Sequence, residues 1–367
     1  MIVPKGAIFV VFGTRPEIIK LSPVIKEFEK RNVRFKTVHT GQHYSFNMDR
    51  IFFDDFELRD PDYILGVGSG THAKQTGQIL IRIEKIFLKE KPCIVVVEGD
   101  TNSVLATALG ATKLGIKVAH IEAGLRSFDR EMPEEINRIL TDHISDYLFA
   151  ATRPAKENLL REGISGKQIF ITGNTIVDAT LGNIEVAQKR SAILSKLKLS
   201  RGNYFLLTLH RQENVDNREK LEGIILSIKE LCRKYLIVFP AHPRTTKKLK
   251  EFDLMEKTRK IENLKITEPA GYYDFLNLEA NAKLILTDSG GIQEEASILK
   301  VPCVTLRDNT ERPETVEIGA NVIAGTERNF ICSAVEKMLK KEKIWKHPFG
   351  DGKTARKIVD ILMKKSS

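Results

Sequence analysis

The chain has 367 residues, 42% hydrophobic and 29% charged, which is an ordinary globular balance at a length that suggests two domains. Its formal net charge of +10 comes from scattered lysines, and suits an anionic small ligand, nucleic acid or simply a lysine-rich surface. The cysteines (Cys93, Cys232, Cys303 and Cys332) form no CxxC pair and no histidine cluster has metal-ligand spacing, which argues against a zinc or disulfide framework. Because there is also no cleavable leader pattern and no long apolar run, we expect a cytoplasmic protein with no membrane span.

Short β-branched runs alternate with helical stretches along the chain, a pattern typical of a doubly wound parallel sheet. In the first half the strand-like runs are 7–12, 35–39, 93–97, 117–121, 147–151 and 169–172. After a helical and basic segment the alternation restarts at 204–210, 236–242, 264–267, 284–288 and 302–306. We therefore predict an α/β fold with two Rossmann-like domains, residues 1–173 and 174–352, with the helix at 353–367 crossing back to complete the first.

Polar and glycine residues follow nearly every predicted strand. Since ligands of open α/β sheets bind beyond the carboxyl ends of the strands, this pattern predicts a cleft between two facing domains. The first such segment, GTRPEIIK (13–20), is a glycine turn into a helix that carries Arg15 and Lys20. Both cations suit a phosphate or sugar, although a capped helix with surface cations would look similar.

The third strand is followed by EGDTNS, which places Asp100 just before a helix. An aspartate there is commonly an N-cap, and the functional alternative is a carboxylate on the floor of the cleft. The fourth strand leads into IEAGLRSFDREMPEEINR (121–138), which crowds five carboxylates and three arginines behind His120. Such crowding serves either proton transfer, since neighbouring groups spread the pKa values of carboxyls, or a structural ion-pair network.

In the second half, HRQEN and AHPR each leave a histidine, His210 and His242, after an apolar strand. The segment LTDSGGIQEEAS (286–297) reads as strand, two glycines and helix. Free N–H groups at a helix start attract phosphate, so this motif together with Arg312 predicts a phosphate site, whereas a plain serine N-cap is the alternative. GVGSG (66–70) departs from the GxGxxG spacing, so we do not expect NAD to bind there.

Taken together, GTRPEIIKLSPV, TGQH, EGDTNSVLA, HIEAGLRS…PEEINR, TLHRQEN, DSGGIQEEA, RDNTERPE and PFGDGKTARKI resemble the non-hydrolysing UDP-N-acetylglucosamine 2-epimerases over nearly the whole chain. The resemblance implies the glycosyltransferase-B arrangement and interconversion of UDP-GlcNAc and UDP-ManNAc, with no NAD and no essential metal. It implies elimination of UDP, an enzyme-bound 2-acetamidoglucal, and re-addition. It also implies a homodimer whose ligands are these nucleotide sugars and UDP, rather than nucleic acid or a membrane.

Site residues follow from the same resemblance. The implied catalytic residues are Asp100, Glu122, Glu134 and His210. The implied nucleotide-binding residues are Arg15, Lys20, His242, Phe275, Ser289, Gly290, Gly291, Glu295 and Arg312. Ala270 stands where some bacterial members have glutamine, so that side-chain contact must come from elsewhere.

Some bacterial relatives bind a second, activating UDP-GlcNAc, and Gln42, His43, Gln75 and Arg211 match positions used there. Lys74 replaces the usual arginine and cannot reproduce its bidentate contact, so activation by substrate is a hypothesis. The alternatives are a glycosyltransferase of the same architecture, a hydrolysing relative that releases ManNAc, and a non-catalytic UDP-sugar sensor. The set of three acids favours the epimerase.

Overall fold

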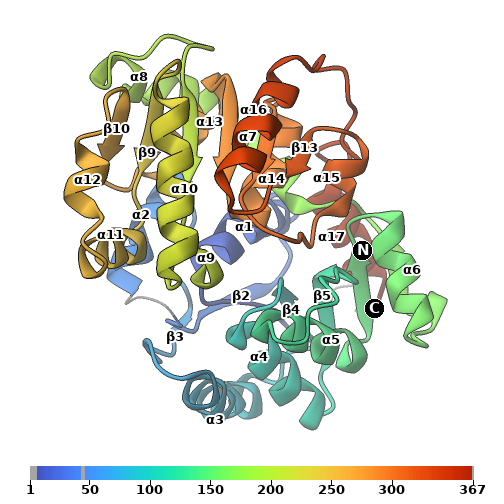
Figure 1. The fold of residues 1–367 in the computed structure, drawn as a ribbon. Helices are drawn as coiled ribbons and strands as arrows, with labels where there is room; N and C mark the ends of the chain where they lie inside the picture. The colour runs from blue at the N-terminus through green and yellow to red at the C-terminus, as the bar shows by residue number, and fades with distance from the viewer. Residues whose placement is uncertain (1–5, 43–45, 366–367) are drawn as a thin grey trace. The chain divides into compact units, whose positions relative to one another are not determined.

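The structure, a computed structural model, describes residues 6–42 and 46–365, and the chain divides into two compact units. Unit 1 is Met1–Leu181 with Pro348–Ser367, and unit 2 is Gly182–His347. Each unit contains one fully parallel sheet covered by helices, which confirms the predicted pair of doubly wound α/β domains (Figure 1). Of the helices that the structure describes, none combines the length and apolar character needed to cross a lipid bilayer.

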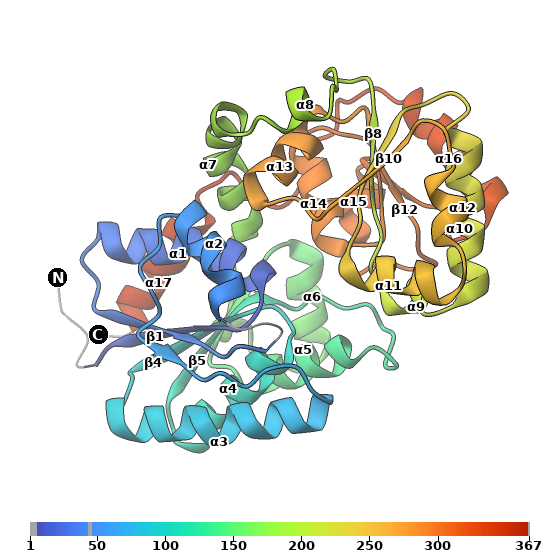
Figure 2. The same cartoon turned by 90° about the vertical axis from the view of Figure 1, so that its left-hand side faces the viewer.

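Unit 1 has a seven-stranded sheet in the order β3-β2-β1-β4-β5-β6-β7. Its strands are β1 (Ile8–Phe12), β2 (Phe35–His39), β3 (Tyr63–Ile64), β4 (Ile94–Glu98), β5 (Lys117–Ala123), β6 (Tyr147–Ala150) and β7 (Ile169–Ile171). Its helices are α1 (Arg15–Lys30), α2 (Phe46–Asp55), α3 (His72–Glu90), α4 (Asn102–Lys113), α5 (Pro133–Ile144), α6 (Arg153–Arg161), the 3-10 turn η1 (Gly166–Gln168) and α17 (Thr354–Lys365). Figure 2 shows α3 and α4 on one face of this sheet and α1 and α17 on the other.

Unit 2 has a six-stranded sheet in the order β10-β9-β8-β11-β12-β13. Its strands are β8 (Phe205–Thr208), β9 (Ile237–Pro240), β10 (Leu264–Thr267), β11 (Leu284–Thr287), β12 (Cys303–Thr305) and β13 (Asn321–Ile323). Its helices are α8 (Ile193–Lys196), α9 (Gln212–Val215), α10 (Arg218–Leu231), α11 (Pro243–Glu251), α12 (Met255–Arg259), α13 (Tyr272–Asn281), α14 (Gly290–Ile298), α15 (Pro313–Glu317) and α16 (Arg328–Leu339). The helix α7 (Thr175–Arg190) begins in unit 1 and continues into unit 2.

The central strands are apolar and buried on both faces. Every residue of β1 and β4 is buried, as parallel strands between two helix layers require. Burial of each such apolar side chain contributes about 1.5–3 kcal/mol. All eleven predicted strand runs overlap an observed strand. The short edge strands β3 and β13 were missed because their side chains are mostly only partly buried and lack a continuous apolar run.

The strand orders locate the point in each sheet where the chain stops adding strands on one side and begins to add them on the other. In unit 1 the chain builds outward from β1 through β2 and β3, then returns to the other side of β1 with β4. In unit 2 the same reversal falls between β8 and β11. Ligands of such sheets bind at these reversal points, so the loops after β1, β4, β8 and β11 are the places to look for chemistry.

The C-terminal helix α17 belongs to unit 1 and packs on α1. Asp178 accepts hydrogen bonds from the backbone N–H groups of Thr354 and Ala355, at 3.2 and 2.9 Å, and so fixes the start of α17. Gly173 is required beside this crossing, because its φ is +94° and an added Cβ would lie 2.7 Å from the carbonyl oxygen of Phe349. The segment after β7 is thereby tied to the returning chain.

Candidate active site

Glu122 lies in β5 with a backbone that an ordinary strand residue does not adopt. Its φ is +70°, and the pairing of β5 with β6 shifts register between Ile121 and Ala123. A bulge of this kind re-aims a side chain, and a non-glycine residue held in the left-handed region costs about 1–3 kcal/mol. Gly124 follows with φ +83°, where a Cβ would lie 2.2 Å from the carbonyl oxygen of Ala155. The packed backbone therefore holds Glu122 in a strained position, as is common at functional sites.

The Glu122 carboxylate belongs to a buried cluster. Lys20 of α1 donates a hydrogen bond to Glu122 Oε2, and its Nζ lies 3.2 Å from Oε1 of Glu98 at the end of β4. The Asn174 side-chain amide, just before α7, donates to Glu122 Oε2 at 3.2 Å. Burial raises the pKa of Glu98 well above its usual range, Lys20 opposes that rise, and Glu122 adds to it. The structure thus places Lys20, expected among the nucleotide-binding residues, against two carboxyl groups.

Asp100 is not the N-cap of α4. That cap is Thr101, whose side chain accepts a hydrogen bond from the Val104 N–H, so the common explanation for an aspartate at this position is wrong. Asp100 instead accepts a hydrogen bond from Arg138, which also donates to Glu135. Asp100 therefore keeps its carboxylate at the end of β4, partly exposed and paired with α5.

Glu135 and Arg138 connect the loop before α5 to Asp100. The Glu135 carboxylate accepts hydrogen bonds from the backbone N–H groups of Ser127 and Phe128, at 2.9 and 3.0 Å. Asn137 of the same helix donates to the carbonyl oxygen of Asp100 at 2.9 Å. These contacts hold the end of β4 and the first turns of α5 together, so Glu135 and Arg138 support the position of Asp100.

Glu134 is half-buried in the first turn of α5, one helical turn before Arg138. Residues four apart lie on the same face of a helix, so Glu134 and Arg138 share one face of α5. Within the part of the chain that the structure describes, the Glu134 side chain forms no hydrogen bond or ion pair. Its carboxyl group is therefore available to a substrate.

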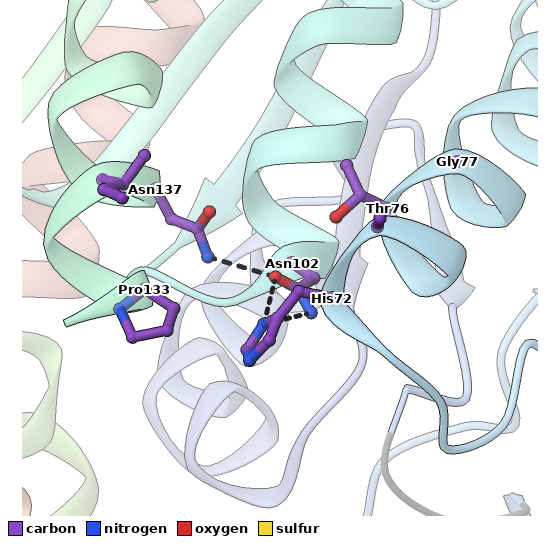
Figure 3. A pocket seen from close by; sticks show the side chains of 8 residues that line it. His72, Thr76, Gly77, Asn102, Pro133 and Asn137 are labelled. Carbon is purple, nitrogen blue, oxygen red and sulfur yellow. Dashed lines mark hydrogen bonds between the residues drawn. The ribbon is translucent and has the colours of Figure 1, made fainter. Parts of the chain in front are cut away.

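A pocket of about 320 Å³ lies where α3, α4 and α5 begin. Figure 3 shows Asn102 at its centre, joined to His72 and Asn137 by hydrogen bonds of 3.2 to 3.3 Å. Asn137 also binds the backbone of Asp100, so this polar network continues into the carboxylate cluster. Pro133, which precedes Glu134, forms part of the pocket wall.

The described residues among the predicted activator positions belong to both units. Gln42 and Gln75 are buried in unit 1, where the Gln75 side-chain amide donates to the Gln42 carbonyl oxygen at 2.8 Å. The Gln42 side-chain oxygen accepts from both the N–H and the hydroxyl of Ser103, at 2.8 and 2.7 Å. His43 lies outside the described residues. Arg211 lies in unit 2, where it pairs with Glu311 at 3.0 Å.

In unit 2, Asp288 after β11 binds the loop after β8. Its carboxylate is fully buried and accepts hydrogen bonds from the backbone N–H groups of His210 and Arg211. The His210 ring is partly exposed, with Nδ1 at 3.4 Å from Asp288 Oδ1. Burial lowers the pKa of His210, Asp288 opposes this, and Arg211 and Arg244 lower it further. His210 is therefore held mainly neutral beside a cluster of cations.

The DSGG motif forms the start of α14 as predicted, with Ser289 as the N-cap and Gly290 and Gly291 as the first helical residues. The Ser289 side chain makes no capping hydrogen bond to the helix, which removes the plain serine cap as its explanation. A Cβ on Gly290 would lie 2.4 Å from Glu311 Oε1, whereas at Gly291 it would meet nothing closer than 4.0 Å. The first N–H groups of a helix have no partner within the helix and carry a partial positive charge, which are the usual features of an anion site.

Cations surround this helix start. Arg312 is the N-cap of α15 and its Nε lies 2.9 Å from Glu294 of α14. Burial would raise the pKa of Glu311, but Arg211, Arg307 and Arg312 hold it well below the usual range. The ionised Glu311 carboxylate pairs with the guanidinium groups of Arg211 and Arg307, and the Arg312 guanidinium donates to the Glu311 backbone carbonyl oxygen at 3.3 Å.

The remaining predicted nucleotide residues occupy both units. His242 is the N-cap of α11, and its ring lies 5.6 Å from that of His210 between centroids. Phe275 of α13 packs partly buried against the apolar core, and Glu295 of α14 is 8% exposed. In unit 1, Arg15 at the start of α1 lies over the Phe52 ring, at 5.2 Å from its centroid. Unit 2 thus contains every predicted nucleotide-binding residue except Arg15 and Lys20.

Four residues of these clusters were missed by sequence reasoning. Glu98 is the charged residue at the end of an otherwise apolar strand, a signal that could have marked it together with Asp100. Glu17 is buried in α1, where it accepts hydrogen bonds from Gly13 N–H and Thr101 Oγ1, both at 2.6 Å. Asp288 directly follows β11 and Asn174 lies shortly after β7, yet their partners lie far away in the sequence and only the fold brings them together.

Comparison with known proteins identifies the family. A family model described as UDP-N-acetylglucosamine 2-epimerase matches residues 26–363. The UDP-N-acetylglucosamine 2-epimerase of Methanocaldococcus jannaschii is 60% identical over 96% of this chain and 98% of its own. The Pseudomonas aeruginosa UDP-2,3-diacetamido-2,3-dideoxy-D-glucuronate 2-epimerase is 41% identical over 97% of this chain and 99% of its own. A crystal structure of the M. jannaschii UDP-GlcNAc 2-epimerase in complex with UDP-GlcNAc and UDP superimposes with a TM-score of 0.93, at 59% identity, covering 98% of this chain and 99% of that one. The chain therefore belongs to the UDP-N-acetylglucosamine 2-epimerase family of isomerases.

Proposed function

We propose that this protein interconverts UDP-GlcNAc and UDP-ManNAc by reversible inversion at C2 of the sugar. The 60% identical M. jannaschii relative has the name of this activity, and the solved M. jannaschii enzyme contains both UDP-GlcNAc and UDP. The observation that carries the proposal is Glu122, a carboxylate held buried in a strained backbone at the end of β5. Backbone strain of this kind is concentrated at functional sites, and folding alone does not require it.

The proposed route is elimination followed by re-addition. A base removes the C2 proton, the C1–O bond breaks with its electron pair leaving on UDP, and a C1=C2 double bond forms to give 2-acetamidoglucal. An acid then returns a proton to the opposite face of C2 while the UDP oxygen re-forms the bond to C1. No ring carbonyl lies next to this proton to spread the developing charge. The reaction therefore depends on placed acid and base groups and on stabilisation of the diphosphate.

The carboxyl groups of unit 1 suit the two proton transfers. We assign these transfers to Asp100, Glu122 and Glu134, which differ in burial and in partners. Acid–base assistance of this kind is typically worth about 10²–10⁴ in rate. Asp100 pairs with Arg138 and Glu122 with Lys20, whereas Glu134 stands unpaired within the described chain.

The edge of unit 2 around α14 suits UDP. The N-terminal N–H groups at Gly290 and Gly291, the Ser289 hydroxyl and the Arg312 guanidinium match the charge of a diphosphate. We assign Glu295 to the ribose hydroxyls, Phe275 and His242 to the rest of the nucleotide, and Arg15 to the phosphates. Mainly neutral His210 is assigned to the charge that develops on the departing UDP.

We also propose that the active form is a cytoplasmic homodimer. Ile81 and Leu88 of α3 and Ile136 and Leu140 of α5 are all more than 40% exposed, and apolar side chains of this size are often covered by a second subunit. Light scattering coupled to size-exclusion chromatography should give twice the monomer mass of 41.5 kDa. A monomer that is fully active would count against the dimer without affecting the reaction proposed.

The experiment that tests this function uses UDP-GlcNAc labelled with ¹⁸O in the bond between C1 and the β-phosphate. Elimination frees the labelled oxygen on UDP, so re-addition should scramble it among the β-phosphoryl oxygens while UDP-ManNAc accumulates without added nicotinamide. A glycosyltransferase would need an acceptor, a hydrolysing enzyme would release ManNAc, and a sensor would bind the nucleotide sugar without turnover. Formation of UDP-ManNAc with the label unmoved would contradict the elimination route.

A further inference from the structure

The cluster around Lys20 contains more carboxyl groups than its cation can neutralise. Glu98 from β4 and Glu122 from β5 both contact Lys20 from α1, and the side chains of Glu98 and Glu122 are no more than 4% exposed. Within the described part of the chain, Lys20 is the one cation within 4 Å of Glu98. Glu17 from α1 adds another buried acid to the surroundings of Glu98. A buried carboxylate without its own counter-ion is costly, so this pair retains a proton.

The contacts of Glu98 and Glu122 indicate which of the two carboxyl groups holds the proton. Glu122 accepts from Lys20 and from the Asn174 amide, and both carboxyl groups lie against the same Lys20 ammonium group. Two carboxyl groups gathered on one cation can bond to each other when one of them is protonated and donates its O–H. Glu98 Oε1 has no partner with hydrogen-bonding geometry in the described chain, so Glu98 is the less well stabilised of the two as an anion. Burial raises the pKa of Glu98 well above its usual range, Lys20 opposes this, and Glu122 and Glu17 add to it.

We propose that Glu98 is a positioning residue that stays protonated and donates its O–H to Glu122, so that Glu122 is the ionised member of the pair and the proton acceptor. This inference rests on the proposed function, because the proton that Glu122 accepts is the C2 proton of the sugar. It adds a role for a residue that never touches the sugar. Lys20, Asn174 and Glu98 would then fix the Glu122 carboxylate through three donors that come from α1, the start of α7 and β4.

Two replacements of similar size separate the hydrogen-bonding role of the Glu98 side chain from its role in packing. In Glu98→Gln the amide N–H takes the place of the carboxyl O–H, so kcat for C2 inversion should stay within about 5-fold of wild type. In Glu98→Leu the donor is lost, and kcat should fall about 10- to 100-fold with KM little changed. If Glu98 served only packing, both replacements would lower the melting temperature and this difference in kcat between them would be absent.

The pH profile gives a second readout. Wild type should lose activity at high pH as Glu98 ionises and competes for Lys20, whereas Glu98→Gln has no such group and should remain active to higher pH. The proposal is overturned by identical pH profiles of wild type and Glu98→Gln, or by full activity in Glu98→Leu. Activity in Glu98→Gln as low as in Glu122→Gln would overturn it too, because Glu98 would then exchange the proton itself.

The protonation state is measurable without turnover. A carboxyl group whose pKa is raised by folding stabilises the protein below its unfolded pKa and loses that contribution as pH rises through the folded pKa. The melting temperature of Glu98→Gln should therefore rise relative to wild type as pH increases. A constant difference from pH 5 to 9 would overturn the proposed protonation. If wild type gives no UDP-ManNAc, the proposed function fails, yet this melting comparison still decides the state of Glu98.

Discussion

The backbone N–H of His210 donates to both carboxylate oxygens of Asp288, at 3.1 and 3.0 Å, and Nδ1 of the same histidine lies 3.4 Å from Asp288 Oδ1. One buried acid at the end of β11 therefore holds the backbone of the histidine that follows β8 and lies beside its ring. This relationship couples the two loops at the reversal point of the unit 2 sheet.

Asp288→Asn should damage both stability and turnover. The amide group offers one acceptor where the carboxylate accepts from several N–H groups, so we expect a loss of about 1–3 kcal/mol in the free energy of unfolding. The rate should fall along with it because His210 loses its support. Urea denaturation and kcat measure the two effects. Asp308→Asn is the matched control, since that aspartate is exposed and pairs only at the surface with Lys220, and it should remain within about 0.5 kcal/mol of wild type.

Loss of any one of the proposed catalytic carboxyl groups should lower turnover without removing the nucleotide site. Asp100→Asn, Glu122→Gln and Glu134→Gln should each reduce kcat by about 10²-fold or more, while calorimetry still detects UDP binding. The exposed Glu131 in the preceding loop provides the control, and Glu131→Gln should behave as wild type. Near-normal kcat in any two of the three variants would refute the assignment of catalysis to these carboxyl groups.

Glu17 makes the stability of unit 1 dependent on pH. Burial raises its pKa from 4.5 to about 7, with Thr101 and Gly13 opposing the rise. Because the folded pKa exceeds the unfolded one, the contribution of Glu17 is complete below pH 4.5 and is lost as pH rises to about 7. The difference amounts to about 3 kcal/mol.

Glu17→Gln tests this dependence, because the amide reproduces the neutral carboxyl and can still accept from Gly13. Relative to this variant, wild type should lose unfolding free energy between pH 5 and pH 8, as measured by urea denaturation followed at both values. Parallel curves for the two proteins would show that Glu17 has the same proton affinity in the folded and unfolded chains.

Activation by substrate is open to a direct kinetic test. If the second site of the bacterial relatives is present, conversion of UDP-ManNAc should accelerate when a trace of UDP-GlcNAc is added. Lys74→Arg restores the bidentate group and should strengthen this response. Hyperbolic kinetics with UDP-ManNAc that added UDP-GlcNAc leaves unchanged would exclude activation. The burial of Gln42 and Gln75 in a unit 1 network makes them poor test sites, since their replacement would disturb folding.

Much of the fold follows from the sequence because its signals are local. The buried runs of β1 and β4 read directly as parallel strands, and the glycines of DSGG mark the start of α14. Two edge strands escaped notice since a strand of two or three residues has too little apolar pattern. The positive φ of Glu122 could not be foreseen either, because it depends on a bulge between β5 and β6 rather than on the residue itself.

The site was less predictable because its groups meet through the fold. Family motifs brought attention to Glu122 and Lys20, but no local pattern indicates that Lys20 binds two carboxyl groups. Glu98 was predicted only as the first residue after the strand at 93–97, and its importance appears only when its neighbours are counted against a single cation. Charge balance inside a folded unit is a three-dimensional property that spacing alone does not reveal.

The most direct test of the whole account is incubation of the protein with UDP-GlcNAc in D₂O, followed by NMR of the C2 position. Removal and return of the C2 proton by the carboxyl groups of unit 1 predicts that UDP-ManNAc forms with deuterium at C2. Accumulation of UDP-ManNAc that retains only protium at C2 would contradict it.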